Sequence, residues 1–182
     1  MSKALIIIDM QQEMQTRLDQ GRDHVNGHAD EVISHLAQKA RLKGVPVIHI
    51  RHAEADETSP FRMGIPSAAP LPCDREEPGE AVFTKTTSSA FASTPLKQHL
   101  DAEGIDSLIV TGAVTGFCVT STVRAASDLG YQVNLVEDGV LGFNLPEAKL
   151  TARQVHDVTI GLLAANFAKI LSEKAALALL EK

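Results

Sequence analysis

The sequence predicts an α/β protein built on an open, mostly parallel sheet, and three features carry this prediction. Residues 4–8 form a continuous apolar run rich in β-branched residues, as expected of a strand buried on both faces. Six such runs alternate with segments of helical character along the chain, a pattern that leads to right-handed crossovers. The chain has 182 residues, 44% of them hydrophobic, so we expect one domain over residues 1–182 with one core.

The first half of the chain contains two predicted strands, one helix and a long loop. After the strand over residues 4–8 comes a polar stretch, and a helix is predicted over 28–43 because apolar residues recur near helical spacing. Residues 45–50 form the second buried strand. The segment 53–80 holds five prolines and shows no periodicity, so we interpret it as a loop that covers an active site.

The second half continues the same alternation of strands and helices. The predicted elements are, in chain order, a strand over 81–85, a helix over 94–103 capped by Thr94, a strand over 107–111, a helix over 116–129, a strand over 131–136, a helix over 148–165, a strand over 167–171 and a terminal helix ending at Lys182. In such a sheet, ligands bind beyond the carboxyl ends of the strands.

Three reactive side chains stand at those carboxyl ends. Asp9 ends the first strand, Lys85 ends the third, and Cys118 opens the helix after the fourth. A cysteine in the first turn of a helix lies near unpaired N–H groups and the positive end of the helix dipole, so we expect a lowered thiol pKa. Lys85 would stabilise the thiolate and Asp9 would carry the proton. Burial can raise the pKa of Asp9 and Lys85 can lower it, and the sequence leaves that balance open.

Composition and charge exclude several classes of protein. The formal net charge is -6 and the 17 basic residues are scattered, so we expect no nucleic-acid partner. The N-terminal apolar run of five residues is too short for a signal-peptide core or a membrane span, so no membrane association and a cytoplasmic location are expected. Cys73 and Cys118 lie far apart without metal-ligand spacing, which predicts neither a zinc site nor a disulfide framework.

Three segments carry a resemblance to a known family: IIIDMQ near the start, VFTKTTSSAF in the middle, and VTGAVTGFCVTSTVRAASDLGYQV later. In this order and spacing, over residues 4–171, the chain resembles the isochorismatase-like cysteine hydrolases. The resemblance implies a three-layer αβα fold with a six-stranded, mostly parallel sheet in a Rossmann-like order. It also implies a catalytic triad of Asp9, Lys85 and Cys118. A cis peptide bond between Ala113 and Val114 is implied as well, with an oxyanion hole formed by the N–H groups of Val114 and Cys118.

The implied activity is hydrolysis of an amide-like C–N bond in a small molecule, through a thioester on Cys118 and without a cofactor. Gln11, Phe91, Thr115 and Phe117 are the candidate substrate-pocket residues, although aromatic residues in such a core are as often packing residues. By analogy with the family, we expect the chain to form a homodimer or a homotetramer. The other molecule that we expect it to bind is a small-molecule substrate.

Departures from the family pattern narrow the range of possible substrates and metal sites. Family nicotinamidases bind a metal through an Asp-x-His pair and further histidines after the second strand, but this chain has HIRHAEADETSPF there. His49, His52 and Asp56 do not reproduce that spacing, so we expect no bound metal. The sequence does not exclude weak metal binding by His52 and Asp56. The aromatic residue that commonly follows the DMQ segment is also missing.

Two other functions remain as alternatives at this point. One is a catalytically silent family member that acts as a ligand-binding or assembly protein. The other is a thiol redox protein, which would need Cys73 as the resolving partner of Cys118.

Overall fold

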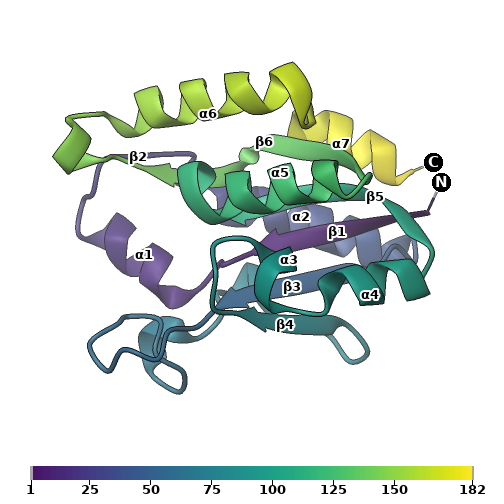
Figure 1. Ribbon diagram of the computed structural model, residues 1–182, viewed down its shortest axis with the longest axis horizontal. Helices are drawn as coiled ribbons and strands as arrows, with labels where there is room; N and C mark the ends of the chain where they lie inside the picture. Colours follow the sequence, from purple (N-terminus) through teal and green to yellow (C-terminus); the bar gives the residue numbers. More distant parts are fainter. Residues whose placement is uncertain (1, 182) are drawn as a thin grey trace.

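The computed structural model describes residues 2–181 and shows a twisted sheet with helices on both faces (Figure 1). The seven strands are β1 (Ser2–Ile8), β2 (His24–Val25), β3 (Val47–His52), β4 (Ala81–Lys85), β5 (Ile105–Ala113), β6 (Gln132–Phe143) and β7 (Lys169–Leu171). Their order is β2-β6-β5-β1-β3-β4, and β7 also pairs with β6. All pairings are parallel except that of β2 with β6.

The predicted α/β class and the six predicted strands are confirmed, and the strand count is corrected to seven. The additional strand, β2, pairs antiparallel with the end of β6 through only two residues. A two-residue strand has no alternating pattern that could mark it in a sequence. The other six strands run parallel in the order β4-β3-β1-β5-β6-β7, which is the doubly wound order expected.

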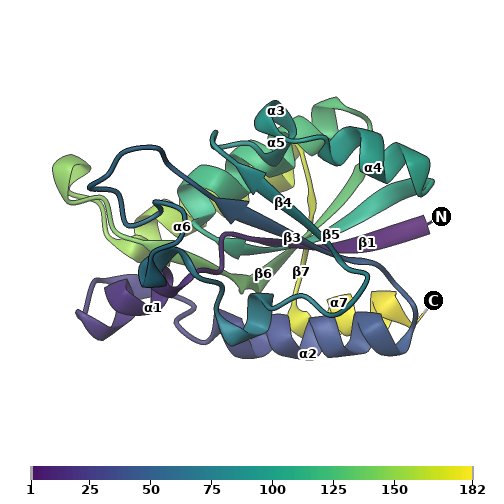
Figure 2. The same cartoon turned by 90° about the horizontal axis from the view of Figure 1, so that it is seen from below.

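Helices form the two outer layers (Figure 2). They are α1 (Gln12–Asp19), α2 (Ala29–Leu42), α3 (Ala90–Ser93), α4 (Leu96–Ala102), α5 (Thr120–Asp128), α6 (Ala152–Asn166) and α7 (Glu173–Leu180). Short 3₁₀ turns η1 (Pro66–Ala68), η2 (Pro72–Asp74) and η4 (Pro146–Ala148) and a π-helical turn η3 (Thr115–Val119) complete the chain. Helices α2 and α7 cover one face of the sheet, and α3, α4, α5 and α6 cover the other.

Several predicted boundaries are corrected. The polar stretch after Asp9 contains α1, which has too few apolar residues to show a helical stripe. The helix expected from Thr94 begins at Leu96 with Pro95 at its N-cap, although the Thr94 hydroxyl still accepts a hydrogen bond from the Leu96 N–H. The terminal helix ends at Leu180, and its predicted end at Lys182 lies outside the described residues.

Strand β6 also runs past its predicted end at residue 136. The pairing of β5 with β6 shifts from Val110–Leu135 to Gly112–Val140, so the acidic pair Glu137 and Asp138 occupies an irregularity inside the strand. Charged residues are uncommon in strands, so the predicted strand ended at residue 136, just before this acidic pair.

The strands separate two apolar clusters, one on each face of the sheet. Leu5 and Ile7 of β1 pack in the cluster under α2 and α7, while Ile6 and Ile8 pack in the cluster under α4 and α5. This alternation explains why β1 is apolar at every position from Ala4 to Ile8. Burial on this scale is the main stabilising contribution to a domain of this size. Within residues 2–181, no helix has the length and apolar character needed to cross a membrane.

One close backbone approach fixes the end of the sheet where the reactive groups meet. Gly112 of β5 pairs with Ile8 of β1 and has φ +120°, a conformation that side-chain-bearing residues rarely adopt. A Cβ atom at Gly112 would lie 2.1 Å from the backbone oxygen of Ile8. Because Asp9 follows Ile8 directly, this contact brings the ends of β1 and β5 together.

Candidate active site

The structure brings together Asp9, Lys85 and Cys118, which come from three separate parts of the chain. Asp9 follows β1 in a left-handed conformation with φ 51°, and its N–H donates to the Ile50 carbonyl at 2.8 Å. Lys85 is the last residue of β4, and Cys118 lies in the π-helical turn η3 that leads into α5. All three therefore lie at the carboxyl edge of the parallel strands, where the sequence predicted them.

The ammonium group of Lys85 connects these residues. Its Nζ donates to Oδ2 of Asp9 at 2.7 Å and to Sγ of Cys118 at 3.2 Å. A third contact, at 3.2 Å, joins Nζ to Nδ1 of His52. An ammonium has three N–H donors and no acceptor, so all three are used and Nδ1 of His52 is the acceptor. The Lys85 side chain is fully buried, and its charge is balanced by the adjacent carboxylate.

His52 is a site residue that sequence reasoning considered only as a metal ligand. It ends β3 and pairs in register with Lys85 of the neighbouring strand, so its position at a strand end was the signal that could have identified it. Because Nδ1 accepts from Lys85, Nε2 carries the proton and donates to Oε1 of Glu54 at 2.9 Å. The ring also packs edge-on against Phe61, with ring centroids 5.3 Å apart.

The protonation states differ from the sequence prediction at Cys118. Desolvation and the charge of Asp9 raise the pKa of the Cys118 thiol to about 12, and together they outweigh Lys85, which lowers it. The predicted lowering of this pKa is therefore wrong for the resting site. Burial also raises the pKa of Asp9 above its usual value of 3.8, against the lowering effect of Lys85. The raised pKa of the thiol favours protonated sulfur at neutral pH, and the raised pKa of Asp9 makes its carboxylate a stronger base.

A cavity of about 400 Å³ opens onto this group. Asp9 and Cys118 line it, together with the end of β5 at Ala113 and Val114. The remaining walls come from α1 and the turn after it, from the end of β3 and the loop after it, from the loop after β4, from η3, and from η4 with the residue before it. They comprise Met14, Arg17, Arg22, His52, Glu54, Phe61, Ser88, Phe117, Leu145 and Glu147. Cys118 is only partly buried, so its sulfur can be reached from this cavity.

Only one of the four candidate pocket residues lines the cavity. Phe117 does, and its side chain is half exposed at the rim. The structure places Gln11, Phe91 and Thr115 elsewhere, so their assignment to the pocket wall is corrected.

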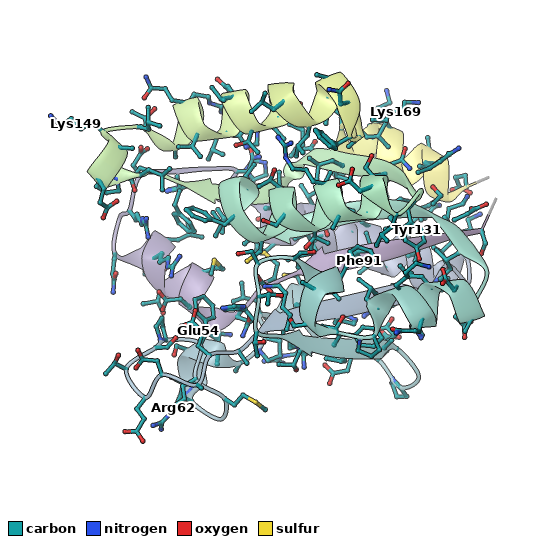
Figure 3. The ribbon with its side chains drawn as sticks, in the orientation of Figure 1. Glu54, Arg62, Phe91, Tyr131, Lys149 and Lys169 are labelled. Carbon is teal, nitrogen blue, oxygen red and sulfur yellow. The ribbon has the colours of Figure 1, made fainter. Side chains whose placement is uncertain are left out.

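Each of these three residues has a structural role. The buried Gln11 amide donates to the carbonyls of His52 and Ala68 and accepts from the His52 N–H, which ties the long loop to β1. The Thr115 hydroxyl is buried and donates to the Leu141 carbonyl. Phe91 stacks on Tyr131 with centroids 5.8 Å apart, and both lie well away from Glu54 of the cavity wall (Figure 3).

The segment 53–80, interpreted from its sequence as a covering loop, contributes two side chains to the cavity wall. Glu54 and Phe61 of this loop line the cavity.

Among residues 2–181, no three His, Cys, Asp or Glu side chains form a group that could hold a metal ion. His52 pairs with Glu54, while Asp56 accepts hydrogen bonds from the Thr58 N–H and hydroxyl groups.

The peptide bond between Ala113 and Val114 is cis. It lies at the end of β5, and the carbonyl of Val114 accepts hydrogen bonds from the N–H groups of Phe117 and Val119. These bonds hold the turn that carries Cys118 against the end of the strand.

Comparison with known proteins places this geometry in a family. The family model described as "Isochorismatase domain" matches residues 3–174, which is nearly the whole chain. The chain belongs to the isochorismatase family. A protein of the isochorismatase family from Chromobacterium violaceum has a crystal structure with a TM-score of 0.92 and 34% identity, covering 99% of this chain and 94% of that one.

Curated relatives in the isochorismatase family extend this result. The isochorismatase family protein YrdC of Bacillus subtilis is 31% identical over 173 residues, covering 93% of this chain and 91% of YrdC. The streptothricin hydrolase of Streptomyces noursei is 32% identical over 153 residues, which cover 80% of this chain and 52% of that enzyme. The fold and the family of the chain are thus the ones that its motifs indicated.

Proposed function

We propose that this isochorismatase-family chain is a cysteine-dependent hydrolase of an amide-like C–N bond in a small molecule, with Asp9, Lys85 and Cys118 as its catalytic triad. The observation that carries the proposal is the position of Lys85, whose Nζ contacts both Oδ2 of Asp9 and Sγ of Cys118. A nucleophile and a base bridged by a cation beside a cavity are what acyl transfer requires.

The first half of the reaction forms a thioester. Asp9 accepts the thiol proton, for which its Oδ1 is available because that atom has no hydrogen-bond partner among residues 2–181. The sulfur of Cys118 attacks the amide carbon, the C=O π electrons move to oxygen, and Lys85 balances the charge of the emerging thiolate. Collapse of this intermediate breaks the C–N bond, and Asp9 returns the proton to the departing nitrogen.

The second half releases the acid. Water enters the cavity, gives a proton to Asp9 and attacks the thioester carbon. The C–S bond then breaks and Asp9 returns the proton to sulfur, so the enzyme is regenerated and one water has been consumed. The raised pKa of Asp9 suits this role, because it makes the carboxylate a better acceptor of the proton from the thiol and from water.

The backbone N–H groups of Val114 and Cys118 are the proposed oxyanion donors. Val114 lines the cavity beside the cysteine, and the turn between them is held by the bonds to the Val114 carbonyl. Loss of one such donor typically costs about 10²–10³ in rate.

The choice of a C–N bond is supported by the relatives. They include a streptothricin hydrolase, a nicotinamidase and a ureidoacrylate amidohydrolase, and each name is that of the relative alone.

The positions of the two cysteines argue against the redox alternative. Cys73 packs in the apolar cluster on one face of the sheet, and Cys118 packs against the cluster on the other face.

The proposal is tested by ammonia release from a panel of small carboxamides. The wild type is expected to hydrolyse at least one of them, and Cys118→Ala is expected to lose at least about 10³-fold in kcat/KM. Cys73→Ala is the matched control, since it removes the other thiol, which lies outside the cavity. Equal rates for wild type and Cys118→Ala would refute the mechanism. Ligand binding without ammonia release across the panel would favour the silent, ligand-binding alternative.

A further inference from the structure

Two arginine side chains line the same cavity wall, on the side of α1. Arg17 belongs to α1, and Arg22 lies in the turn between α1 and β2. Both guanidinium groups lie over the ring of the buried Phe143, at 5.8 Å and 5.2 Å from its centroid. Arg17 also lies 5.7 Å from the Phe61 centroid. The two rings therefore fix both cations at the cavity.

Hydrogen bonds orient the Arg22 guanidinium further. Its Nε and Nη2 donate to the Oδ1 and the backbone oxygen of Asn144 at 3.1 Å and 3.0 Å. Arg17 donates from Nε to Oε1 of Glu13 at 2.8 Å. Within residues 2–181, Nη1 of Arg22 and both Nη atoms of Arg17 donate to no protein atom. Rigid guanidinium groups with free N–H donors bind carboxylates well.

Among residues 2–181, no carboxylate forms an ion pair with Arg22. Glu13 is paired with Arg17, and Glu54 is engaged by Nε2 of His52. Glu147 lies on the exposed turn η4 at the outer rim. One guanidinium charge, that of Arg22, therefore has only the neutral Asn144 as its partner. An anion that reaches Arg22 therefore meets a guanidinium whose charge is not paired with a carboxylate among residues 2–181.

We propose that the substrate carries a carboxylate at the end remote from the scissile amide, and that Arg22, assisted by Arg17, binds this carboxylate while Cys118 attacks the amide. The inference rests on the proposed amide hydrolysis and adds the class of substrate. Arg22 is then a specificity-determining residue, because a carboxylate held at one end of the molecule orients the carbonyl at the other.

The first test compares matched substrates that differ only in charge. Ammonia release is measured for malonamate, succinamate and glutaramate and for the corresponding neutral diamides. One of the three acids is expected to exceed its diamide in kcat/KM by at least about 10-fold, because a charge-assisted bond to a fixed guanidinium is lost in the diamide. Arg22→Gln is expected to remove this preference, with the larger loss of kcat/KM on the acid.

Two further variants keep the test interpretable. Arg153→Gln removes an exposed arginine on α6, outside the cavity, and is expected to leave the preference intact. Arg22→Lys retains the charge and is expected to preserve part of the preference, whereas a purely structural role of Arg22 would make both Arg22 variants unfold at lower temperature. Thermal unfolding of each variant is measured alongside the kinetics.

Binding provides a readout that does not depend on turnover. Malonate, succinate and glutarate are titrated into the wild type and Arg22→Gln by calorimetry, with the diamides as neutral controls. At least one dicarboxylate is expected to bind, with an affinity about 10-fold lower in Arg22→Gln. Equal binding or turnover of acids and diamides, or an unchanged preference in folded Arg22→Gln, would overturn the inference. If no amide is hydrolysed but the dicarboxylate still binds through Arg22, the proposed function fails and only the carboxylate site at Arg22 stands.

Discussion

Nζ of Lys85 lies 2.7 Å from Oδ2 of Asp9, although 76 residues separate them in the chain and β3 lies between their strands. Both side chains are buried, with exposed fractions of 0% and 4%. A buried ion pair costs desolvation to form, but removal of one partner costs more because the other charge is left uncompensated. The pair therefore links the stability of the sheet edge to the chemistry of the site.

Lys85→Met is expected to lower the free energy of unfolding by about 3–5 kcal/mol at pH 7. The loss should be smaller at pH 5, because the isolated carboxyl of Asp9 then takes up a proton more readily. Urea denaturation at both pH values checks this. The control is Lys97→Met, which removes an exposed pair with Asp101 and should change stability little. Equal losses in the two variants would contradict the coupling of Lys85 to a buried charge.

The resting thiol of Cys118 is expected to react slowly with iodoacetamide at pH 7, because its pKa is raised to about 12. The labelling rate should rise with pH without a plateau below about pH 10. Asp9→Asn should shift the profile to lower pH, since it removes the second of the two causes that raise this pKa. Peptide mass spectrometry in a Cys73→Ser background measures the rates. Fast labelling with a plateau near neutral pH would show instead that a thiolate is present at rest.

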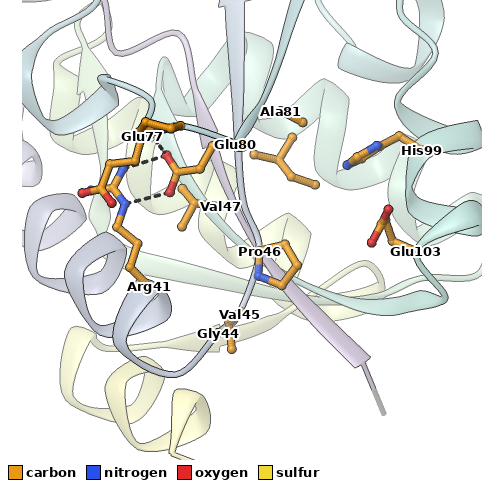
Figure 4. Close-up of a pocket in the computed structure, with 13 residues that line it drawn as sticks. Arg41, Gly44, Val45, Pro46, Val47, Glu77, Glu80, Ala81, His99 and Glu103 are labelled. Atoms are coloured by element: carbon orange, nitrogen blue, oxygen red, sulfur yellow. Dashed lines mark hydrogen bonds and ion pairs between the residues drawn. The ribbon is translucent and has the colours of Figure 1, made fainter.

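His49 forms a buried charge network on the side of the sheet covered by α2. Its Nδ1 bonds Oδ1 of Asp74 at 2.7 Å and its Nε2 bonds Oε2 of Glu80 at 2.9 Å. The Glu80 carboxylate is also held by Arg41, beside a second cavity of about 430 Å³ (Figure 4). Burial lowers the pKa of His49, but its bonds and charge interactions with the two carboxylates outweigh burial and raise it overall.

This network predicts a loss of stability as the pH rises. A histidine with a raised folded pKa contributes stability that is fully present below its unfolded pKa of about 6.5 and is lost as the pH rises through the folded value. The free energy of unfolding of the wild type should therefore fall between pH 6 and pH 9, and the fall should be shallower in His49→Gln. Urea denaturation across this range is the measurement, with the exposed His24→Gln as control. Parallel profiles for wild type and His49→Gln would exclude the network as the cause.

Gly112→Ala is expected to destabilise the protein by more than about 3 kcal/mol, because the added Cβ would meet the Ile8 backbone at 2.1 Å and φ is +120°. Gly21→Ala is the matched control, since Gly21 also has a positive φ, of +70°, but has nothing within 4 Å of the added atom. Its cost should be about 1 kcal/mol. Thermal and urea unfolding distinguish the two. If both variants lose the same stability, the close approach of β5 to β1 does not constrain this edge.

The main features of the fold could be predicted because strong local patterns specify them. The apolar run of β1 is buried on both faces, and β4 has the predicted bounds 81–85. Asp9 and Lys85 could be placed at the site because the carboxyl ends of parallel strands meet at one edge.

The cavity walls could not be predicted in the same way. Arg17 lies on a mostly polar helix with only two apolar residues, and Glu54 and Phe61 belong to a loop without periodicity. Gln11 stands next to the site in sequence, but its amide bonds to loop backbone instead. The pKa of Cys118 also depends on burial and on the nearby Asp9, and neither can be read from the position of a cysteine at a helix start.

The thioester on Cys118 is tested most directly by partitioning with hydroxylamine. A carboxamide that the protein hydrolyses is incubated with enzyme and increasing hydroxylamine, and the hydroxamate and acid products are quantified by mass spectrometry. Wild type should form hydroxamate in proportion to hydroxylamine at the expense of the acid, while ammonia release stays at least as fast, and Cys118→Ala should form neither product. Ammonia release by wild type without hydroxamate, or turnover by Cys118→Ala, would contradict a covalent intermediate on this residue.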